Sequence, residues 1–464
     1  MLPWQAAAVE KLLHLRVGAL YMEMGTGKTR TCLEFISRRI DGGKMAKAIW
    51  LCPCSVKGNL RNDLAKHCDG WESVIQIHGI ESLSGSLSLY ERLMKEADMD
   101  TMIVVDESNL VKNHHAIRTM RITNIAEKCK YRMILNGTPV SRNEGDLFSQ
   151  WYILDYRILG FRSYWAFSNK HLEYDPDIPG KIVRVLGVDT LIKKIEPYSF
   201  QVLKSECFEL PEKKCETICT SLDAEQDEHY CEMVEHMLGQ IDERKPETVY
   251  RMFSAAQSII SGLWVKDNNG HLETRPMFGS PMDNPRIADL MACVDEFIKD
   301  EQCIIFCKYT HEITSILALM GNRALPFYGD IKAKDRDANV AAFRDGKAQF
   351  LVGNKTCAGY GLNLQFCRNV IYYSNDWDYA TRAQSEDRVH RFGQTREVRI
   401  FDIVAEGTLD ERIMSCLRRK EGLEADVKRA LAGSGTSKAA LRKMMMGNGK
   451  EKKNGKGVHE PKRP

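Results

Sequence analysis

A glycine-rich loop near the amino terminus constrains the fold of this chain more than any other segment. The octapeptide MEMGTGKT begins at Met22. Gly25 and Gly27 allow a tight backbone path in which successive N–H groups point inward at phosphate oxygens. Lys28 can then reach the β- and γ-phosphates of a nucleotide, and the Thr29 hydroxyl can hold Mg²⁺. Met22 replaces the first glycine of the usual pattern, so the loop alone is also compatible with an ordinary turn before a helix.

Two later segments point to the same chemistry. The apolar run 102–105 suits a buried parallel strand and places Asp106 and Glu107 at its carboxyl end, where α/β sheets bind ligands. Asp106 is the candidate Mg²⁺ ligand, and Glu107 is the candidate base for the attacking water. The segment RVHRFGQ carries Arg388 and Arg391, whose spacing predicts one face of a helix. A phosphate loop, a carboxylate pair and two arginines together predict a nucleoside triphosphatase.

The composition limits the classes of protein to which this chain can belong. The 464 residues suffice for two or three domains, and 43% hydrophobic with 28% charged residues is typical of globular proteins. A net charge of +3 gives no overall basic character, so any nucleic-acid surface must be local. The 15 cysteines form no C-x-x-C pair, which favours small buried side chains in a reducing compartment over a zinc site at Cys215 and Cys219. Because no apolar run approaches the ~20 residues of a membrane span, we expect an intracellular protein, cytoplasmic or nucleoid-associated, without a membrane partner.

Short apolar segments alternate with helical stretches in two parts of the chain, which predicts an α/β fold with parallel, doubly wound sheets. The predicted strands are 48–52, 74–78, 102–105 and 132–135, followed by 303–307, 348–352, 369–373 and 399–404. Aromatic-rich amphipathic stretches between them predict a helical region, closed by a Pro- and Gly-rich linker at 267–285. The expected domains are a first lobe at 1–160 (completed by about 205–225), a helical insertion and linker at 161–285, a second lobe at 286–432 and a disordered basic tail at 433–464.

The order of these motifs resembles that of superfamily-two helicase-like ATPases, and within them the SWI/SNF-type DNA translocases. The resemblance covers roughly residues 2–430 and is similar to the minimal bacterial or phage-like forms. The matching segments are LPWQ at 2–5, MEMGTGKT at 22–29, LCPCSVKGNLRNDLAKH at 51–67, DESNLVKN at 106–113, NGTP at 136–139, FELPEKKCETICTSLDAEQ at 208–226, IIFCKYTHEI at 304–313, LVGNKTCAGYGLNLQFCRNVIYYSNDWD at 351–378 and QSEDRVHRFGQTREVRIFDIVAEGTLDERI at 384–413. The R-x-G-Q form at 391–394 is the most specific of them.

The resemblance implies two RecA-like lobes that bind ATP and Mg²⁺ and move on duplex DNA without reading its sequence. The implied nucleotide-binding residues are Gln5 (for adenine), Met24, Gly25, Thr26, Gly27, Lys28, Thr29, Gly361, Arg388 and Arg391. The implied nucleic-acid contacts are Pro53, Lys57, Lys112, Lys308, Thr356 and Asn363. Arg391 would be the arginine finger, with Arg388 as a γ-phosphate or interlobe partner.

Two alternatives remain beside the duplex translocase. One is a helicase that separates strands of DNA or RNA. The other is a nucleotide-gated DNA sensor with little turnover, which is suggested by Asn109, since the family usually has His at this position. Residues 438–464 carry nine Lys and Arg against two Glu, and such a tail either tethers DNA or stays in solvent.

Overall fold

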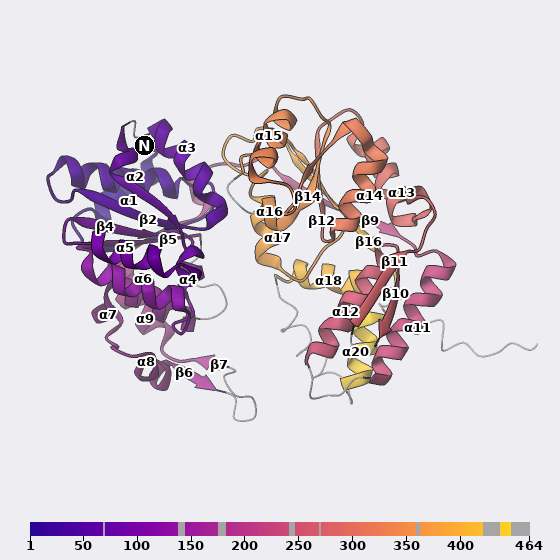
Figure 1. Ribbon diagram of the computed structural model, residues 1–464, viewed down its shortest axis with the longest axis horizontal. Coiled ribbons are helices and arrows are strands. Elements are labelled where there is room, and N and C mark those ends of the chain that lie inside the picture. The colour runs from indigo at the N-terminus through magenta and orange to yellow at the C-terminus, as the bar shows by residue number, and fades with distance from the viewer. Residues whose placement is uncertain are drawn as a thin grey trace, which may run out of the picture. The chain divides into compact units, whose positions relative to one another are not determined.

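The computed structural model describes residues 1–67, 70–137, 144–174, 182–240, 246–268, 271–358, 362–420 and 437–446 (Figure 1). The chain divides into two compact units, Met1–Glu209 and Leu210–Pro464. Among the helices in these described ranges, none has the length and apolar character needed to cross a bilayer.

The first unit is built on a six-stranded sheet in the order β3-β2-β4-β5-β1-β8, in which every pairing is parallel. Its strands are β1 (Val17–Met22), β2 (Lys47–Cys52), β3 (Ile75–Gly79), β4 (Thr101–Val105), β5 (Tyr131–Asn136) and β8 (Ser199–Val202). Strands such as Thr101–Val105 are buried along their whole length, because helices cover both faces of the sheet (Figure 1).

Helices of the first unit form two layers around this sheet. One apolar cluster joins the sheet to α1 (Pro3–Leu12), α2 (Lys28–Asp41) and α3 (Lys57–His67). The cluster on the other face includes side chains of α5 (Leu87–Glu96), α6 (Ile117–Lys128), α7 (Leu147–Leu159), α8 (Tyr164–His171) and α9 (Val188–Ile195). The smaller elements are α4 (Ser82–Gly85), α10 (Lys204–Cys207) and the antiparallel pair β6 (Leu172–Tyr174) and β7 (Ile182–Val185).

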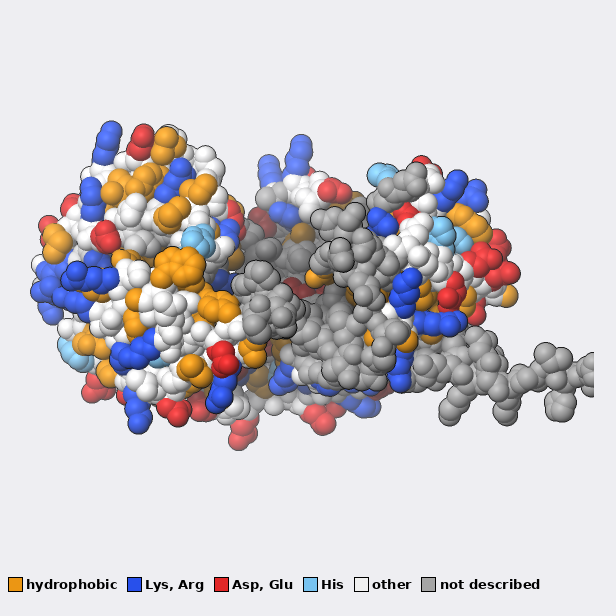
Figure 2. All heavy atoms as spheres, turned by 90° about the horizontal axis from the view of Figure 1, so that it is seen from below, with side chains coloured by type: hydrophobic (Ala, Val, Ile, Leu, Met, Phe, Trp, Pro, Cys, Tyr) orange, Lys and Arg blue, Asp and Glu red, His pale blue; other side chains and the backbone are white. Residues whose placement is uncertain are grey.

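Some apolar side chains of the first unit lie at its surface. Figure 2 shows the molecule from the side of α8 and the β6–β7 pair, with hydrophobic side chains scattered among charged ones. Trp165, Val183 and Ile192 are the most exposed of them on α8, β7 and α9. Scattered apolar side chains of this kind are normal on protein surfaces.

The second unit has its own parallel six-stranded sheet, in the order β13-β14-β12-β15-β16-β9. Its strands are β9 (Lys213–Thr220), β12 (Cys303–Cys307), β13 (Ala324–Phe327), β14 (Phe350–Asn354), β15 (Asn369–Tyr372) and β16 (Val398–Ala405). One face packs on α13 (Pro285–Cys293) and α14 (Thr310–Met320), and the other packs on α15 (Ala333–Arg344). The two short helices α16 (Lys355–Ala358) and α17 (Tyr379–Glu386) follow β14 and β15. The expected α/β fold with two doubly wound lobes is therefore confirmed.

A third cluster in the second unit joins helices to a hairpin. Its elements are α11 (Ala224–Gln240), α12 (Pro246–Ile260), β10 (Leu263–Asn268), β11 (His271–Pro276), α18 (Leu409–Arg418) and α20 (Ser437–Met445). The stretch expected as a linker at 267–285 thus contains β11 and the start of α13 instead.

The expected domain boundaries need two corrections. The strand at 213–220 does not complete the first lobe: it is β9, and all eight of its residues pair with β16 in the second sheet. The first sheet is completed instead by β8, which lies beside β1. The helical insertion expected at 161–285 is also divided, since α8 and α9 pack in the first unit while α11 and α12 pack in the second.

The basic tail also differs from the expectation, because α20 is an ordered helix within it. Leu441, Met444 and Met445 are buried on one face of α20, at the spacing that brings helical residues together. The Tyr230 hydroxyl donates a hydrogen bond to the Met445 carbonyl oxygen at 2.6 Å. Hydrophobic burial therefore orders this part of a segment whose cationic composition indicated disorder. The remaining tail, 447–464, lies outside the described residues.

Candidate functional site

The glycine-rich loop joins β1 to α2 in the first unit. Gly25 and Gly27 have φ values of +87° and +91°, a backbone region that strains other residues. The Thr26 hydroxyl donates to the Glu23 carbonyl oxygen at 2.7 Å. Lys28 Nζ donates to the Met22 carbonyl oxygen, also at 2.7 Å, so the ammonium lies against the start of the loop. The loop is thus closed on itself directly before the first turn of α2, the geometry that suits phosphate binding.

Gln5 is packed directly against this loop. It is buried, and its Oε1 accepts a hydrogen bond from the Leu2 N–H at 2.9 Å. Its Nε2 lies 3.4 Å from the Thr26 carbonyl oxygen, which also accepts a bond from Trp4 Nε1 at 2.9 Å. A Cβ at Gly27 would overlap the Gln5 amide. The structure therefore brings Gln5 to the loop, and its contact with adenine stays a prediction.

This packing makes Gly27→Ala a sharp test of the loop. The new methyl group would meet the Gln5 amide while the backbone stays in a left-handed conformation, at a cost of about 1–3 kcal/mol. We expect a lower Tm and weaker ATP binding, measured by thermal melting and by titration with a fluorescent nucleotide. Gly58→Ala is the matched control, because a Cβ there meets no atom within 4 Å and lies in helix α3. Equal effects of the two substitutions would contradict the role of the Gln5–Gly27 contact.

The acidic pair follows β4 at the same edge of the sheet. The Asp106 N–H donates to the Leu51 carbonyl oxygen at 2.7 Å, and Asp106 Oδ1 accepts from the Glu107 N–H at 2.9 Å. Burial raises the pKa of Asp106 well above its usual range, the Glu107 charge raises it further, and Lys28 opposes the shift. Strand β5 alone separates β1 from β4 in the sheet. The structure thus brings Lys28, Asp106 and Glu107 together, as the sequence predicts.

Glu107 has a backbone conformation that is uncommon for a residue with a side chain. Its φ of +49° and ψ of 57° lie in the left-handed region. Such strain persists only where the surrounding structure imposes it, and it is frequent at functional sites. The conformation ends the strand geometry of β4 directly after Asp106.

The segment after Glu107 is anchored by a residue that sequence reasoning missed. Ser108 Oγ donates to Gln150 Oε1 at 2.6 Å, and Gln150 is 1% exposed on α7. Asn109 Oδ1 is buried and has no hydrogen-bond partner among the described residues. Gln150 is one of several polar residues on α7, so its place in the sequence did not mark it. Thr138 and Pro139 of the NGTP segment lie outside the described ranges, and Asn136 is buried at the end of β5.

Arg388 and Arg391 lie in the second unit, but the expected helix is wrong. Helix α17 ends at Glu386, and both arginines follow it in turns. Tertiary hydrogen bonds favour the turns over a longer helix. The Leu364 N–H donates to the Arg388 carbonyl oxygen at 3.1 Å, and Arg391 Nη1 donates to Asn363 Oδ1.

These two arginines differ in their surroundings. Arg388 is buried, whereas the Arg391 side chain is only partly covered. Gln394 of the same motif is buried, and its Nε2 donates to the Cys367 carbonyl oxygen at 3.0 Å. Gln394 therefore holds the turn against the neighbouring loop. Gly361, the remaining nucleotide candidate of this unit, lies outside the described residues.

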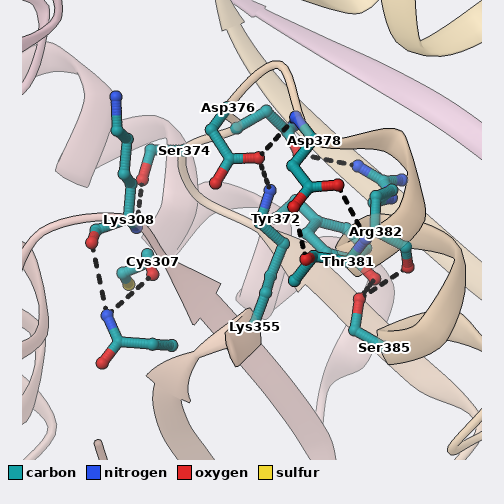
Figure 3. A network of polar contacts seen from close by, with 12 residues as sticks. Cys307, Lys308, Lys355, Tyr372, Ser374, Asp376, Asp378, Thr381, Arg382 and Ser385 are labelled. Carbon is teal, nitrogen blue, oxygen red and sulfur yellow. Dashed lines mark hydrogen bonds and ion pairs between the residues drawn. The ribbon is translucent and has the colours of Figure 1, made fainter. Parts of the chain in front are cut away.

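A network of buried charges supports α17, and sequence reasoning missed it. Arg382 is 5% exposed and lies over the ring of Tyr372, with its Cζ 3.4 Å from the ring centroid. Its guanidinium donates to both carboxylate oxygens of Asp402 at 2.6 and 3.0 Å. Nearby, Lys355 points at Asp376, with 2.8 Å between Nζ and Oδ1 (Figure 3). Charged residues are usually solvated, so their sequence alone did not indicate this network.

The candidate nucleic-acid residues lie at or near the carboxyl ends of strands in both units. Pro53 follows β2, and Lys57 is the first residue of α3. Lys112 pairs with Asp146 at 3.6 Å. In the second unit Thr356 and Asn363 are exposed, while Lys308 Nζ donates to Gln257 Oε1 and burial lowers its pKa. Lys308 is thus less accessible than expected for a phosphate contact.

Two sequence families match the chain. The family described as the SNF2-related domain matches residues 70–261, and the helicase conserved C-terminal domain matches residues 286–393. These matches agree with the resemblance seen in the motifs.

Individual relatives show the same likeness. A rice protein named "Probable chromatin-remodeling complex ATPase chain" is 26% identical over 88% of this chain and 39% of its own length. An ISWI chromatin-remodeling complex ATPase of Arabidopsis thaliana is 25% identical over 88% of this chain and 40% of its own. The chain thus spans less than half the length of these relatives. Among solved structures, the Sulfolobus solfataricus SWI2/SNF2 ATPase core in complex with dsDNA is 22% identical, with 96% of each chain covered and a TM-score of 0.41.

Proposed function

We propose that this chain hydrolyses ATP to move along duplex DNA, since it belongs to the SNF2-related family of helicase-like ATPases. The observation that carries this proposal is the assembly of Lys28, Asp106 and Glu107 at one edge of the first sheet. A phosphate loop and a carboxylate pair in this arrangement are the parts that nucleotide hydrolysis requires.

In the proposed reaction the first unit holds the nucleotide. Backbone N–H groups of the loop and Lys28 bind the phosphates, and Glu107 takes a proton from the attacking water. Asp106 and Thr29 offer the hard oxygen ligands that Mg²⁺ prefers, and a cation beside the buried Asp106 would favour its charged form. The ion, when bound, neutralises charge that develops on the phosphates.

The second unit supplies the arginines in this proposal. Arg391 would stabilise the charge of the transition state, and Arg388 would bind the γ-phosphate or bridge the units. Their contribution depends on the position of the second unit, so hydrolysis would be coupled to domain movement. Contacts through Lys57, Thr356 and other residues that bind the DNA backbone would convert the movement into steps without reading sequence.

Displacement of a triplex-forming strand tests the movement on duplex DNA. The wild-type protein with ATP should release a third strand bound downstream on a duplex, while Glu107→Gln should not. A forked duplex in parallel distinguishes the alternative helicase, which would release a strand from the fork. Release from the fork without triplex displacement would overturn the duplex translocase. Asn109→His tests the alternative of a sensor with little turnover. If Asn109 causes the low activity of such a sensor, this substitution should raise the rate of ATP hydrolysis.

The cationic tail should strengthen DNA binding without entering catalysis. Deletion of 447–464 removes six Lys and Arg residues but leaves α20 in place. We expect the slope of log K against log[salt] to fall by about 0.9 for each cation that contacts a phosphate, with kcat at saturating DNA unchanged. Titration of a labelled duplex at several salt concentrations measures this slope. An unchanged slope would assign DNA binding to the two units alone.

A further inference from the structure

A groove of about 460 Å³ runs along the outer strand of the first sheet. Residues 75–78 of β3 form its base, and helices on both sides form its walls. Helix α3 contributes Arg61 and Leu64, and α5 contributes Arg92 and Glu96. Strands β2, β4 and β5 separate this groove from β1, and none of the candidate nucleotide-binding residues lines it.

The base of the groove presents unpaired backbone groups. Within the described ranges β3 pairs with β2 alone, and the Ala48 N–H donates to the Val74 carbonyl oxygen at 2.9 Å. Backbone groups of successive residues in a strand point to opposite sides. The N–H and C=O groups of Ile75, Ile77 and Gly79 therefore point away from β2, and of these three residues Ile77 is the partly exposed one. An open strand edge of this kind is a template for a further strand.

The two faces of the groove differ in chemistry. The register places Ile77 beside Trp50 and His78 beside Leu51, and these two neighbours belong to clusters on opposite faces of the sheet. Ile77 and the buried Leu64 make an apolar face on the side of α3. His78 lies on the polar face on the side of α5. An extended chain, whose side chains alternate between faces, fits this pattern.

Cations exceed anions around the groove. Arg61 and Arg92 line it. Burial lowers the pKa of His78, and the charges of Arg92, Lys57 and Arg61 lower it further, so all three cations lie near His78. Glu96 is the one carboxylate in the lining, and its Oε2 is buried without a hydrogen-bond partner among the described residues. The site therefore offers excess positive charge and one acceptor for a donor group of a ligand.

We propose that the edge of β3 binds an extended acidic peptide of a protein partner, which joins the sheet as a further strand. Main-chain hydrogen bonds to β3 provide affinity, and Arg92 on the wall formed by α5 selects acidic side chains. A peptide fits better than a nucleic acid, because the base is a strand edge with an apolar face.

Fluorescence anisotropy tests this proposal with the full chain in the absence of nucleotide. The probe is a labelled octapeptide of alternating glutamate and valine. One comparison peptide has lysine in place of glutamate, and another has N-methyl groups on alternate valines, which remove backbone donors. We expect the acidic peptide to bind at least about tenfold more tightly than either comparison, as loss of one good contact predicts. Equal binding of the N-methylated peptide would overturn the added strand.

Substitutions on α5 test whether the peptide binds in this groove. Arg92→Glu should weaken binding of the acidic peptide by about tenfold or more. Lys95→Glu is the matched control, since Lys95 is exposed on the same helix and does not line the groove. Wild-type ATP hydrolysis by Arg92→Glu would show that the variant is folded. The proposal fails if Arg92→Glu binds the peptide normally, or if a duplex oligonucleotide displaces the peptide and loses affinity through the same substitution.

Discussion

Replacement of Arg391 by alanine should lower kcat for ATP hydrolysis by ~10³–10⁵ while nucleotide affinity changes little. An arginine finger meets the charge that develops on the γ-phosphate, so its loss affects the transition state more than the ground state. Arg391 is only partly covered, and its Nη1 donates to Asn363 Oδ1. Steady-state kinetics with saturating duplex DNA and titration with a fluorescent nucleotide measure both quantities.

Arg396→Ala is the matched control for this prediction. Arg396 lies in the same segment but is half exposed and pairs with Glu301 at 3.5 Å. It should therefore have nearly wild-type kcat. Arg388→Ala is measured in parallel, and a severe loss at Arg388 with a mild loss at Arg391 would exchange the two roles.

Glu107→Gln should lower kcat by ~10²–10⁴, because the amide cannot accept the proton of the attacking water. The substitution keeps the shape of the side chain, so ATP should still bind. Lys28→Ala should instead lose ATP affinity, since the lysine contacts phosphate in both ground and transition states. A fluorescent nucleotide and a phosphate-release assay separate these two effects.

Glu34→Gln serves as the carboxylate control for Glu107→Gln. Glu34 lies on α2 and pairs with Arg38 at 3.0 Å, away from the acidic strand. It should hydrolyse ATP at the wild-type rate. If Glu107→Gln also turned over ATP at the wild-type rate, another residue would be the base.

The sequence predicted those parts of the fold whose signal is local. Strands such as β4 and β12 are short apolar runs that are buried on both faces, and this burial requires the apolar pattern that revealed them. Strands β8 and β13 are edge strands of four residues each. Polar residues interrupt β8 and a proline interrupts β13, so neither gave a comparable signal. The segment 205–225, which contains β9, was assigned to the wrong lobe, because the partner strand β16 lies far along the chain.

In the candidate site, too, the sequence revealed residues in local motifs but not residues that depend on distant partners. Lys28, Asp106 and Glu107 were predicted from motifs in which neighbouring residues carry the chemistry. Arg382 was not, because its burial depends on Asp402, which lies 20 residues away. The helix α20 was missed for a related reason: the cationic composition of the tail concealed three apolar residues on one face. Long-range pairing and the burial it creates are therefore what the sequence did not reveal.

The most direct measurement is the rate of ATP hydrolysis without nucleic acid and with single-stranded DNA, duplex DNA or RNA. A motor that moves on duplex DNA should hydrolyse ATP fastest with the duplex, and Glu107→Gln should abolish that stimulation. Stimulation by single strands or RNA but not by the duplex would contradict movement on duplex DNA. The absence of turnover under all four conditions would contradict the motor itself.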